Sequence, residues 1–407
     1  MDRRNFVQSV LLASASPLVN ASIASDVKKA VASVLNSLNR GPLAIAMWDF
    51  SWLERRWPGA GYENWDVVLD ELLCRGYNAV RIDAYPHLIA LDPEREWELL
   101  PEWNMQAWGA PGRCIIKVQP SLNEFIKKCK ARGIEVALST WFRQDVDDVR
   151  LNLTRPEDHI RIRGKTLESI AREGLLDNIL YVDFNNEFPV WCKFLPDHYI
   201  RNSPGGYKWM KIIEDGLRTK YKDIPFTFSF AHEFINYKTE NVSTHDFLEL
   251  HLWMTLYSEF YSEINYNFER FDPKGFENVQ LKAEKLYRSK PLYWQNKLKE
   301  GVDLLIDWSK LSGKPLVTTE CWGIVDYKDF PMLNWDWVKD LCAIETIQAA
   351  ASGRWLAIAT SNFCGPQFVG MWRDIKWHQR LTTIIKTAQI DPSFEDNRLM
   401  KRIFHLH

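Results

Sequence analysis

Residues 61–85 read GYENWDVVLDELLCRGYNAVRIDAY, and this stretch decides the fold. Its first part predicts a helix that Gly76 ends, with one apolar face formed by Trp65, Val68, Leu69, Leu72 and Leu73. The run YNAVRIDAY (77–85) follows at once and is almost continuously apolar, which is typical of a parallel strand covered on both faces. The stretch therefore predicts a helix that leads directly into a buried parallel strand.

The same unit recurs along the chain. Helices are also predicted over 335–353 and over 120–133, where Ser121 and Glu124 have the spacing of a capping box. Strand-like apolar runs occur eight times, at 42–50, 77–85, 134–142, 178–187, 225–230, 246–253, 314–322 and 354–363. This repetition predicts an α/β fold, a (β/α)8 TIM barrel, as a single domain. An open doubly wound sheet is the alternative, but WDFSWLERRWPG (48–59) lacks the glycine-rich phosphate turn of nucleotide folds.

Two connections are longer than a barrel requires, 86–119 after the second strand and 254–300 after the sixth. Both are rich in aromatic residues. Because both follow strands, we expect these long loops at the C-terminal face of the barrel, where barrel enzymes build their sites.

Composition narrows the class of protein. Of the 407 residues 46% are hydrophobic and 26% charged, which is typical of a soluble globular protein. The net charge of −2 gives no reason to expect a nucleic acid or an acidic membrane surface as partner. The 19 tryptophans fit either a large core or a groove that stacks on sugar rings, and composition alone favours the core. The seven cysteines have no metal-ligand spacing, and no metal or organic cofactor is predicted.

The N-terminus resembles an export signal. Residues 1–24 combine a basic start, a short apolar stretch and small residues, and Arg3-Arg4-Asn5-Phe6 matches the twin-arginine pattern. An ordinary secretion signal is the alternative. The apolar stretch is too short to span a membrane, so no anchor is predicted. We therefore expect an exported protein, periplasmic or extracellular, whose barrel occupies residues 25–407.

Chemistry in such a barrel is expected at the C-terminal ends of the strands. The candidates there are Trp48, Asp49, Arg81, Asp83, Trp141, Asn186, Glu187, His251, Trp253, Glu320 and Trp322. Glu187 and Glu320 are carboxylates set in apolar runs, the fourth and the seventh, which a barrel places on opposite sides of one pocket. A facing carboxylate pair is what glycoside hydrolysis requires, although a single glutamate at a strand end is more often part of a salt bridge.

Several of these residues match short motifs of a known enzyme family. Asn186-Glu187 followed by Pro189, Glu320 on the seventh strand and Arg81 in VRIDAY resemble the cellulase-like glycoside hydrolases of clan A, in particular the sugar-binding cellulase-like family. The resemblance implies Glu187 as acid/base, Glu320 as nucleophile, Asn186 as a ligand of the sugar 2-hydroxyl, and Arg81 as support of the nucleophile. It extends over the whole barrel.

The sequence departs from the family pattern at two places. Phe188 intervenes before the proline of Asn-Glu-Pro, and His251-Leu252-Trp253 replaces His-x-Tyr on the sixth strand, so the tyrosine role is vacant or filled from elsewhere, for instance by Tyr257. The main hypothesis is a retaining glycoside hydrolase for β-linked glycosides. A barrel that binds sugar without cleaving it, and a transglycosylase on the same residues, are the alternatives. Trp48, Trp141 and Trp322 are expected as sugar-stacking platforms, or else as packing of the barrel rim.

Overall fold

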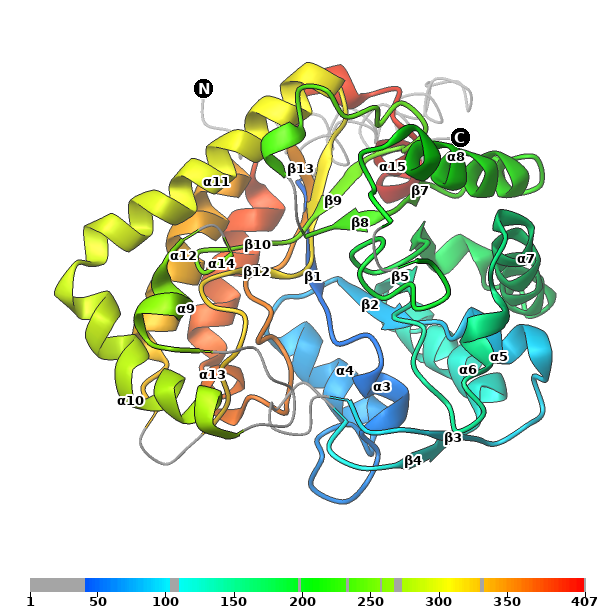
Figure 1. Ribbon diagram of the computed structural model, residues 1–407, viewed down its shortest axis with the longest axis horizontal. Helices are drawn as coiled ribbons and strands as arrows, with labels where there is room; N and C mark the ends of the chain where they lie inside the picture. The colour runs from blue at the N-terminus through cyan, green and yellow to red at the C-terminus, as the bar shows by residue number, and fades with distance from the viewer. Residues whose placement is uncertain are drawn as a thin grey trace, which may run out of the picture. The chain divides into compact units, whose positions relative to one another are not determined.

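Parallel strands pair side by side to form a barrel with helices around it (Figure 1). The structure, a computed structural model, describes residues 41–102, 110–196, 199–231, 234–256, 258–266, 273–329 and 333–405. In chain order the barrel strands are β1 (Leu43–Ala46), β2 (Ala79–Asp83), β5 (Glu135–Ser139), β6 (Ile179–Asp183), β7 (Phe226–Thr227) with β8 (Ser229–Phe230), β9 (Leu248–Leu250), β11 (Leu316–Thr318) and β13 (Trp355–Ile358). Each of the predicted apolar runs contributes one strand position to the barrel.

The barrel closes through its fifth strand position. The hydrogen-bonded order is β7-β6-β5-β2-β1-β13-β11-β9-β8, so β7 and β8 lie at the two ends of the sheet. Only Phe228 separates β7 from β8 along the chain. The two ends are therefore halves of one segment, β7 pairing with β6 and β8 with β9. The predicted eight-stranded parallel barrel is confirmed.

Helices cover the outside of the barrel and occupy its connections. The helices that follow barrel strands are α4 (Trp65–Cys74), α6 (Val118–Lys130), α7 (Pro156–Arg172), α8 (Pro204–Arg218), α11 (Pro291–Ser312), α12 (Asp336–Ala351) and α14 (Ile375–Thr387). Further helices are α3 (Ser51–Glu54), α5 (Pro86–Leu91), α9 (Phe260–Glu263), α10 (Pro273–Ser289), α13 (Val369–Trp372) and α15 (Arg398–Ile403). Short 3-10 turns are η1 (Val149–Asn152), η2 (Leu176–Asn178), η3 (Phe234–Asn236) and η4 (Pro392–Phe394).

The connection from β8 to β9 breaks the strand–helix alternation. In its described part, residues 231 and 234–247, the only helical element is η3. The sequence there, AHEFINYKTENVSTHD (231–246), is mainly polar and rich in Asn, Ser and Thr, whose side chains compete with a helix by bonding to nearby backbone groups.

Helix α4 shows how the predicted unit folds. Asn64 caps it by accepting from the backbone N–H of Asp66 and Val67, and Gly76 follows its end with φ of 87°. Its buried face consists of Trp65, Val68, Leu69 and Leu72. The prediction that Leu73 belongs to this face is wrong, because Leu73 is 39% exposed.

Helix α6 begins differently from its prediction. Gln119 has extended backbone angles (φ −106°, ψ 136°), so the regular helix starts at Pro120, a residue whose fixed φ suits a first helical position. Ser121 therefore lies inside the first turn instead of at the cap. The predicted capping box is wrong for this reason.

The two long connections follow the second and the sixth barrel strand, as the sequence predicts, but they contain regular helices and strands instead of being plain loops. The segment after β2 contains α5 and an antiparallel hairpin of β3 (Trp97–Leu99) and β4 (Cys114–Ile116). The segment after β9 contains β10 (Leu252–Trp253), which pairs with β12 (Cys321–Trp322), and then α9, α10 and the start of α11. No helix in the described ranges is long and apolar enough to cross a membrane. The predicted export signal, residues 1–24, lies outside those ranges and stays a prediction.

Candidate active site

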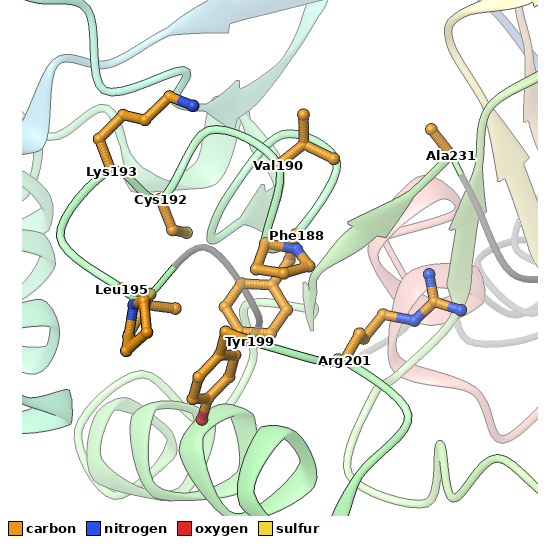
Figure 2. A pocket seen from close by; sticks show the side chains of 10 residues that line it. Phe188, Val190, Cys192, Lys193, Leu195, Tyr199, Arg201 and Ala231 are labelled. Atoms are coloured by element: carbon orange, nitrogen blue, oxygen red, sulfur yellow. The ribbon is translucent and has the colours of Figure 1, made fainter.

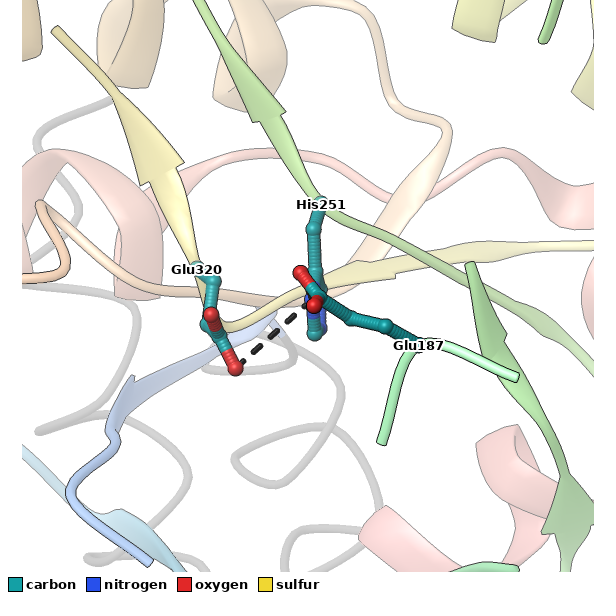
Figure 3. A group of neighbouring side chains, drawn as sticks. All are labelled: Glu187, His251 and Glu320. Atoms are coloured by element: carbon teal, nitrogen blue, oxygen red, sulfur yellow. Dashed lines mark hydrogen bonds and ion pairs between the residues drawn. The ribbon is translucent and has the colours of Figure 1, made fainter. Parts of the chain in front are cut away.

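Three side chains meet at the C-terminal ends of the barrel strands (Figure 3). Glu187 follows β6, His251 lies between β9 and β10, and Glu320 lies between β11 and β12. One carboxylate oxygen of each glutamate and one ring nitrogen of the histidine all lie within 4.8 Å of one another. All three side chains are buried. The structure therefore brings together the two predicted carboxylates, which lie far apart in sequence.

The backbone around Glu187 is held from both sides. Glu187 has φ of 50°, a left-handed conformation that a residue with a side chain adopts only when its surroundings impose it. The N–H of Asn186 donates to the Thr140 carbonyl, that of Glu187 to Ser229 Oγ, and that of Phe188 to the Ser229 carbonyl, each at 2.9 Å. Phe188, the residue added to the family pattern, thus helps to fix the turn that presents Glu187.

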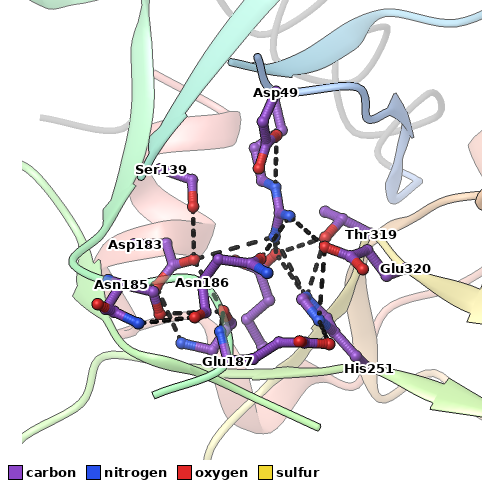
Figure 4. A network of polar contacts seen from close by, with 12 residues as sticks. Asp49, Ser139, Asp183, Asn185, Asn186, Glu187, His251, Thr319 and Glu320 are labelled. Atoms are coloured by element: carbon purple, nitrogen blue, oxygen red, sulfur yellow. Dashed lines mark hydrogen bonds and ion pairs between the residues drawn. The ribbon is translucent and has the colours of Figure 1, made fainter. Parts of the chain in front are cut away.

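Arg81 of β2 connects the polar groups of the site. Figure 4 shows the polar network that includes Asp49, Asn186 and Glu320. Its Nη2 donates to Glu320 Oε1 and to Asn186 Oδ1, both at 2.7 Å. Nη1 donates to Glu249 Oε1 at 2.6 Å, and Nε to Asp49 Oδ1 at 2.9 Å. The expected contact between Arg81 and Glu320 is present, and the same guanidinium also orients Asn186.

His251 lies between the two carboxylates. Its Nδ1 is 3.1 Å from Glu187 Oε1 and 3.6 Å from Glu320 Oε1. Burial would lower the pKa of His251, but the Glu320 charge and the hydrogen bonds to Glu187 and Glu249 raise it to about 10. The two glutamates thus favour a proton on Nδ1 of His251, whereas Arg81 Nη1, which can only donate, lies 3.2 Å from its Nε2.

Carboxyl groups outnumber cations in this cluster. Facing Arg81 and His251 are five carboxyl groups, those of Asp49, Asp183, Glu187, Glu249 and Glu320. Burial, and then the charge of Glu187 against the opposing charges of His251 and Arg81, raises the pKa of Glu320 to about 8. Because the two glutamates interact, this raised pKa belongs to the pair, which shares a proton near neutral pH.

The same trio has the spacing of metal ligands. Arg81 donates directly to Glu320 Oε1 at 2.7 Å, so a guanidinium already supplies positive charge beside one of the three groups. The expectation of a site without metal or cofactor stays a prediction.

Three other predicted residues, Asp49, Asp83 and Trp141, form hydrogen bonds that hold the site in place. Asp49 accepts from Arg81 through Oδ1 and from the Trp141 indole N–H through Oδ2 at 2.6 Å. Asp83 accepts from the backbone N–H groups of Tyr85 (2.7 Å) and Trp141 (2.8 Å). Its two oxygens are thus engaged in holding loops, and this does not fit the expected sugar contact of Asp83.

The predicted tryptophans differ in their surroundings. Trp48 packs against Phe368 at a ring distance of 5.0 Å, and Trp253 lies 6.0 Å from the His251 ring. Trp322 is 0% exposed, and its indole N–H donates to the Ala359 carbonyl. No face of Trp322 is open to a ligand in this structure, so the expected stacking role does not fit it.

Sequence reasoning missed three residues of the site. Glu249 could have been found, because Leu248-Glu249-Leu250-His251 alternates and places Glu249 on the same side of the strand as His251. Asp183 interrupts the apolar run of β6, which is a weaker signal. Trp191, whose Nε1 donates to Glu187 Oε2 at 3.1 Å, lies in a loop and has no sequence signal. Tyr257, the suggested substitute for the family tyrosine, lies outside the described residues.

A pocket of about 260 Å³ is lined by the segment that follows Glu187 (Figure 2). Its walls include Phe188, Val190, Leu195 and Tyr199. The described residues that line it do not include Glu187 or Glu320, so it is separate from the candidate active site.

Comparisons with known proteins agree with this fold. The family model described as sugar-binding cellulase-like matches residues 45–386. A solved structure from Parabacteroides distasonis ATCC 8503, provisionally described as a glycoside hydrolase, is 50% identical with a TM-score of 0.87, over 89% of this chain and 99% of that one. A glycoside hydrolase of family 5 from Bacteroides vulgatus ATCC 8482 is 13% identical with a TM-score of 0.45, over 78% of this chain and 57% of that one, a similarity too distant to bear on function. No curated protein matches the chain significantly. The chain belongs to the sugar-binding cellulase-like family.

Proposed function

We propose that the protein is a retaining glycoside hydrolase for β-linked glycosides, with Glu187 as acid/base and Glu320 as nucleophile. The spacing of the pair supports this most strongly, since one oxygen of each carboxylate lies within 4.8 Å of the other. Retaining enzymes hold their carboxyl groups about 5–5.5 Å apart, whereas inverting enzymes need about 6.5–9.5 Å to admit a water molecule between them. The close approach of the two carboxylates favours double displacement, and the stereochemistry of the product tests it.

In the first step Glu320 attacks the anomeric carbon, and the glycosidic carbon–oxygen bond breaks. The proton of Glu187 passes to the leaving oxygen. Arg81 lies within hydrogen-bonding distance of Glu320 Oε1, which favours the negative charge on Glu320 and the shared proton on Glu187. His251 also approaches Oε1, so we assign the attack to Oε2 of Glu320.

In the second step Glu187, now a carboxylate, takes a proton from water. The water oxygen bonds to the anomeric carbon and releases Glu320 as a carboxylate. The transition state of both steps resembles an oxocarbenium ion. The excess of carboxyl groups over cations around Glu187 and Glu320 stabilises that positive charge in a buried site.

Unsatisfied donors mark where the sugar would bind. Among the residues that the structure describes, Asn186 Nδ2 and Trp253 Nε1 are buried without a hydrogen-bond partner. A buried donor without a partner costs free energy, about 1–3 kcal/mol, which a sugar hydroxyl can offset. Asn186 is oriented by Arg81 beside Glu187, as a ligand of the 2-hydroxyl requires. We include Trp48 and Trp141 as the wall of the same subsite. Both oxygens of Asp49 are engaged by Arg81 and Trp141, so Asp49, like Asp83, holds other groups in place instead of contacting the sugar.

The stereochemistry of the product tests the proposal. With a panel of 4-nitrophenyl β-glycosides followed by NMR, we expect the β-anomer of the sugar to appear first. Glu320→Ala should lose turnover and, with azide, yield the α-glycosyl azide, whereas Glu187→Ala with azide should yield the β-glycosyl azide. An α-anomer as first product would contradict the proposal.

A sugar-binding protein without turnover is the second candidate. The family description and the replacement of His-x-Tyr by His251-Leu252-Trp253 favour it. It would be supported if calorimetry shows binding of sugars from the same panel while none is hydrolysed.

A further inference from the structure

Trp191 contacts the candidate acid/base directly. Its indole Nε1 donates to Glu187 Oε2 at 3.1 Å, on the carboxylate oxygen opposite the one that faces His251. Trp191 is 9% exposed, so the bond lies in a largely dry environment. The two oxygens of Glu187 thus have different neighbours, an indole donor on one side and the imidazole on the other.

Trp191 is itself held by the residues that hold Glu320. Its ring packs against that of Trp141 with centroids 5.0 Å apart. Trp141 donates to Asp49 at 2.6 Å, Asp49 accepts from Arg81 at 2.9 Å, and Arg81 donates to Glu320 at 2.7 Å. A continuous series of contacts therefore connects one carboxylate of the pair to the other.

We propose that Trp191 is a positioning residue for Glu187, and that the series Trp191–Trp141–Asp49–Arg81 fixes the acid/base relative to the nucleophile. The inference rests on the proposed function, in which Glu187 donates and recovers a proton. The donor on Oε2 holds the Glu187 carboxyl group in one orientation, with Oε1 beside His251. It also stabilises the carboxylate form that activates water in the second step.

Removing the N–H should change the acid/base more than the fold. Trp191→Phe keeps an aromatic ring against Trp141 and deletes the donor. Among the groups that the structure describes, His251 from the β9–β10 junction and Glu320 from the β11–β12 junction also face Glu187, and Arg81 of β2 acts through Glu320. Since a hydrogen bond to a carboxylate stabilises its charged form, the variant should hold the Glu187 proton to higher pH.

The first measurement needs no substrate. In protein labelled with ¹³C at the glutamate carboxyl carbons, the Glu187 signal is assigned by its absence in Glu187→Gln. We expect its titration midpoint in Trp191→Phe to lie about one pH unit above that of the unsubstituted protein. Trp191→His, which keeps a ring N–H, should reverse part of the shift.

The second measurement follows turnover of phenyl and 2,4-dinitrophenyl β-glycosides of a sugar that the unsubstituted protein hydrolyses. Trp191→Phe should lower kcat/KM for the phenyl glycoside, which needs a proton on its leaving oxygen, by about 10–100-fold. The dinitrophenyl glycoside departs without that proton, so its kcat/KM should change less than about threefold.

Trp209→Phe is the matched control. Trp209 of α8 packs against Phe194 and Tyr199 of the same loop and has no role in the site. Trp209→Phe should leave the titration midpoint of Glu187 unchanged and preserve the ratio of kcat/KM for the two glycosides. The proposal is overturned if Trp191→Phe leaves the midpoint in place, or lowers both rates equally. If no glycoside is hydrolysed by the unsubstituted protein, the proposed hydrolase function fails, while the NMR titration still decides the contact of Trp191 with Glu187.

Discussion

At the scale of single residues, Arg81 binds four side chains of the site at once. It contacts Asp49, Asn186, Glu249 and Glu320 while being wholly buried, so its positive charge is the counterpart of several buried carboxylates. Removing one partner of a buried ion pair leaves the other charge uncompensated, which is more destabilising than the pair is stabilising. Arg81 therefore matters to the fold and to the chemistry together.

Arg81→Met tests both roles. We expect the free energy of unfolding to fall by about 3–5 kcal/mol, measured by urea denaturation near pH 7. Because the buried carboxylates can then be neutralised only by protonation, the loss should shrink at acid pH. An equal loss at pH 5 and pH 7 would contradict the account of Arg81 as their counterion.

The position of a residue at a strand end could be predicted from the sequence only where the side chains alternate regularly up to that residue. Glu187, Glu320 and Arg81 follow from their place in apolar runs. Trp322 is two residues after Glu320, so in a continuous strand both side chains would lie on the same face. However, β11 ends at Thr318 and β12 begins only at Cys321. The alternation is interrupted there, and Trp322 lies in the core. Trp191 reaches Glu187 from a loop, and loop conformation has no periodic signal in a sequence.

At the scale of elements, most helices and strands follow from apolar periodicity, while their ends do not. The cap of α6 is set by Pro120 and Gln119 instead of the predicted Ser121, because local backbone angles decide where a helix begins. In the described part of the connection from β8 to β9 there is no α-helix, and that segment is mainly polar and rich in Asn, Ser and Thr. Element existence is thus more predictable than element boundaries.

Two glycines at helix ends provide a matched test of how closely the helix ends are packed. Gly76 and Gly133 follow α4 and α6 with φ of 87° and 65°. A Cβ at Gly133 would meet no atom within 4 Å, whereas one at Gly76 would lie 2.3 Å from Thr382 Oγ1. Gly133→Ala should destabilise by about 1–2 kcal/mol through its left-handed backbone alone, and Gly76→Ala by about 1–3 kcal/mol more through overpacking. Equal losses of unfolding free energy would refute the close packing of Gly76 against Thr382.

Helix α12 buries a carboxyl group at its contact with α11. Burial, moderated by Lys299, raises the pKa of Glu345 from 4.5 to about 8. The folded state therefore holds this proton more tightly than the unfolded state, so its contribution to stability is complete below pH 4.5 and is lost as the pH rises to about 8.

Glu345→Gln should remove this dependence. We expect the variant to melt at a higher temperature than the unsubstituted protein at pH 8, with the difference disappearing at pH 4.5. Glu300→Gln, the same change at an exposed position of α11, controls for residue type. A constant difference in melting temperature between the two pH values would show that burial of Glu345 is not the cause.

At the scale of the whole molecule, the barrel converts distant sequence positions into one site. Parallel strands end at the same rim, so β2, β6, β9 and β11 bring Arg81, Glu187, His251 and Glu320 together. The side chains of this cluster are buried, which strengthens every charge interaction among them. The sequence predicts this convergence because the order of the strands determines it.

The central claim is that Glu320 forms a covalent bond with the sugar. The most direct test is incubation with 2-deoxy-2-fluoro-β-glycosyl fluorides of the gluco, galacto and manno series, followed by digestion and mass spectrometry. We expect the mass of the protein to increase by one fluoroglycosyl group on the peptide that contains Glu320, and no increase in Glu320→Gln. Labelling of Glu187 instead, or hydrolysis of the matching glycoside with no adduct and with inversion, would contradict the claim.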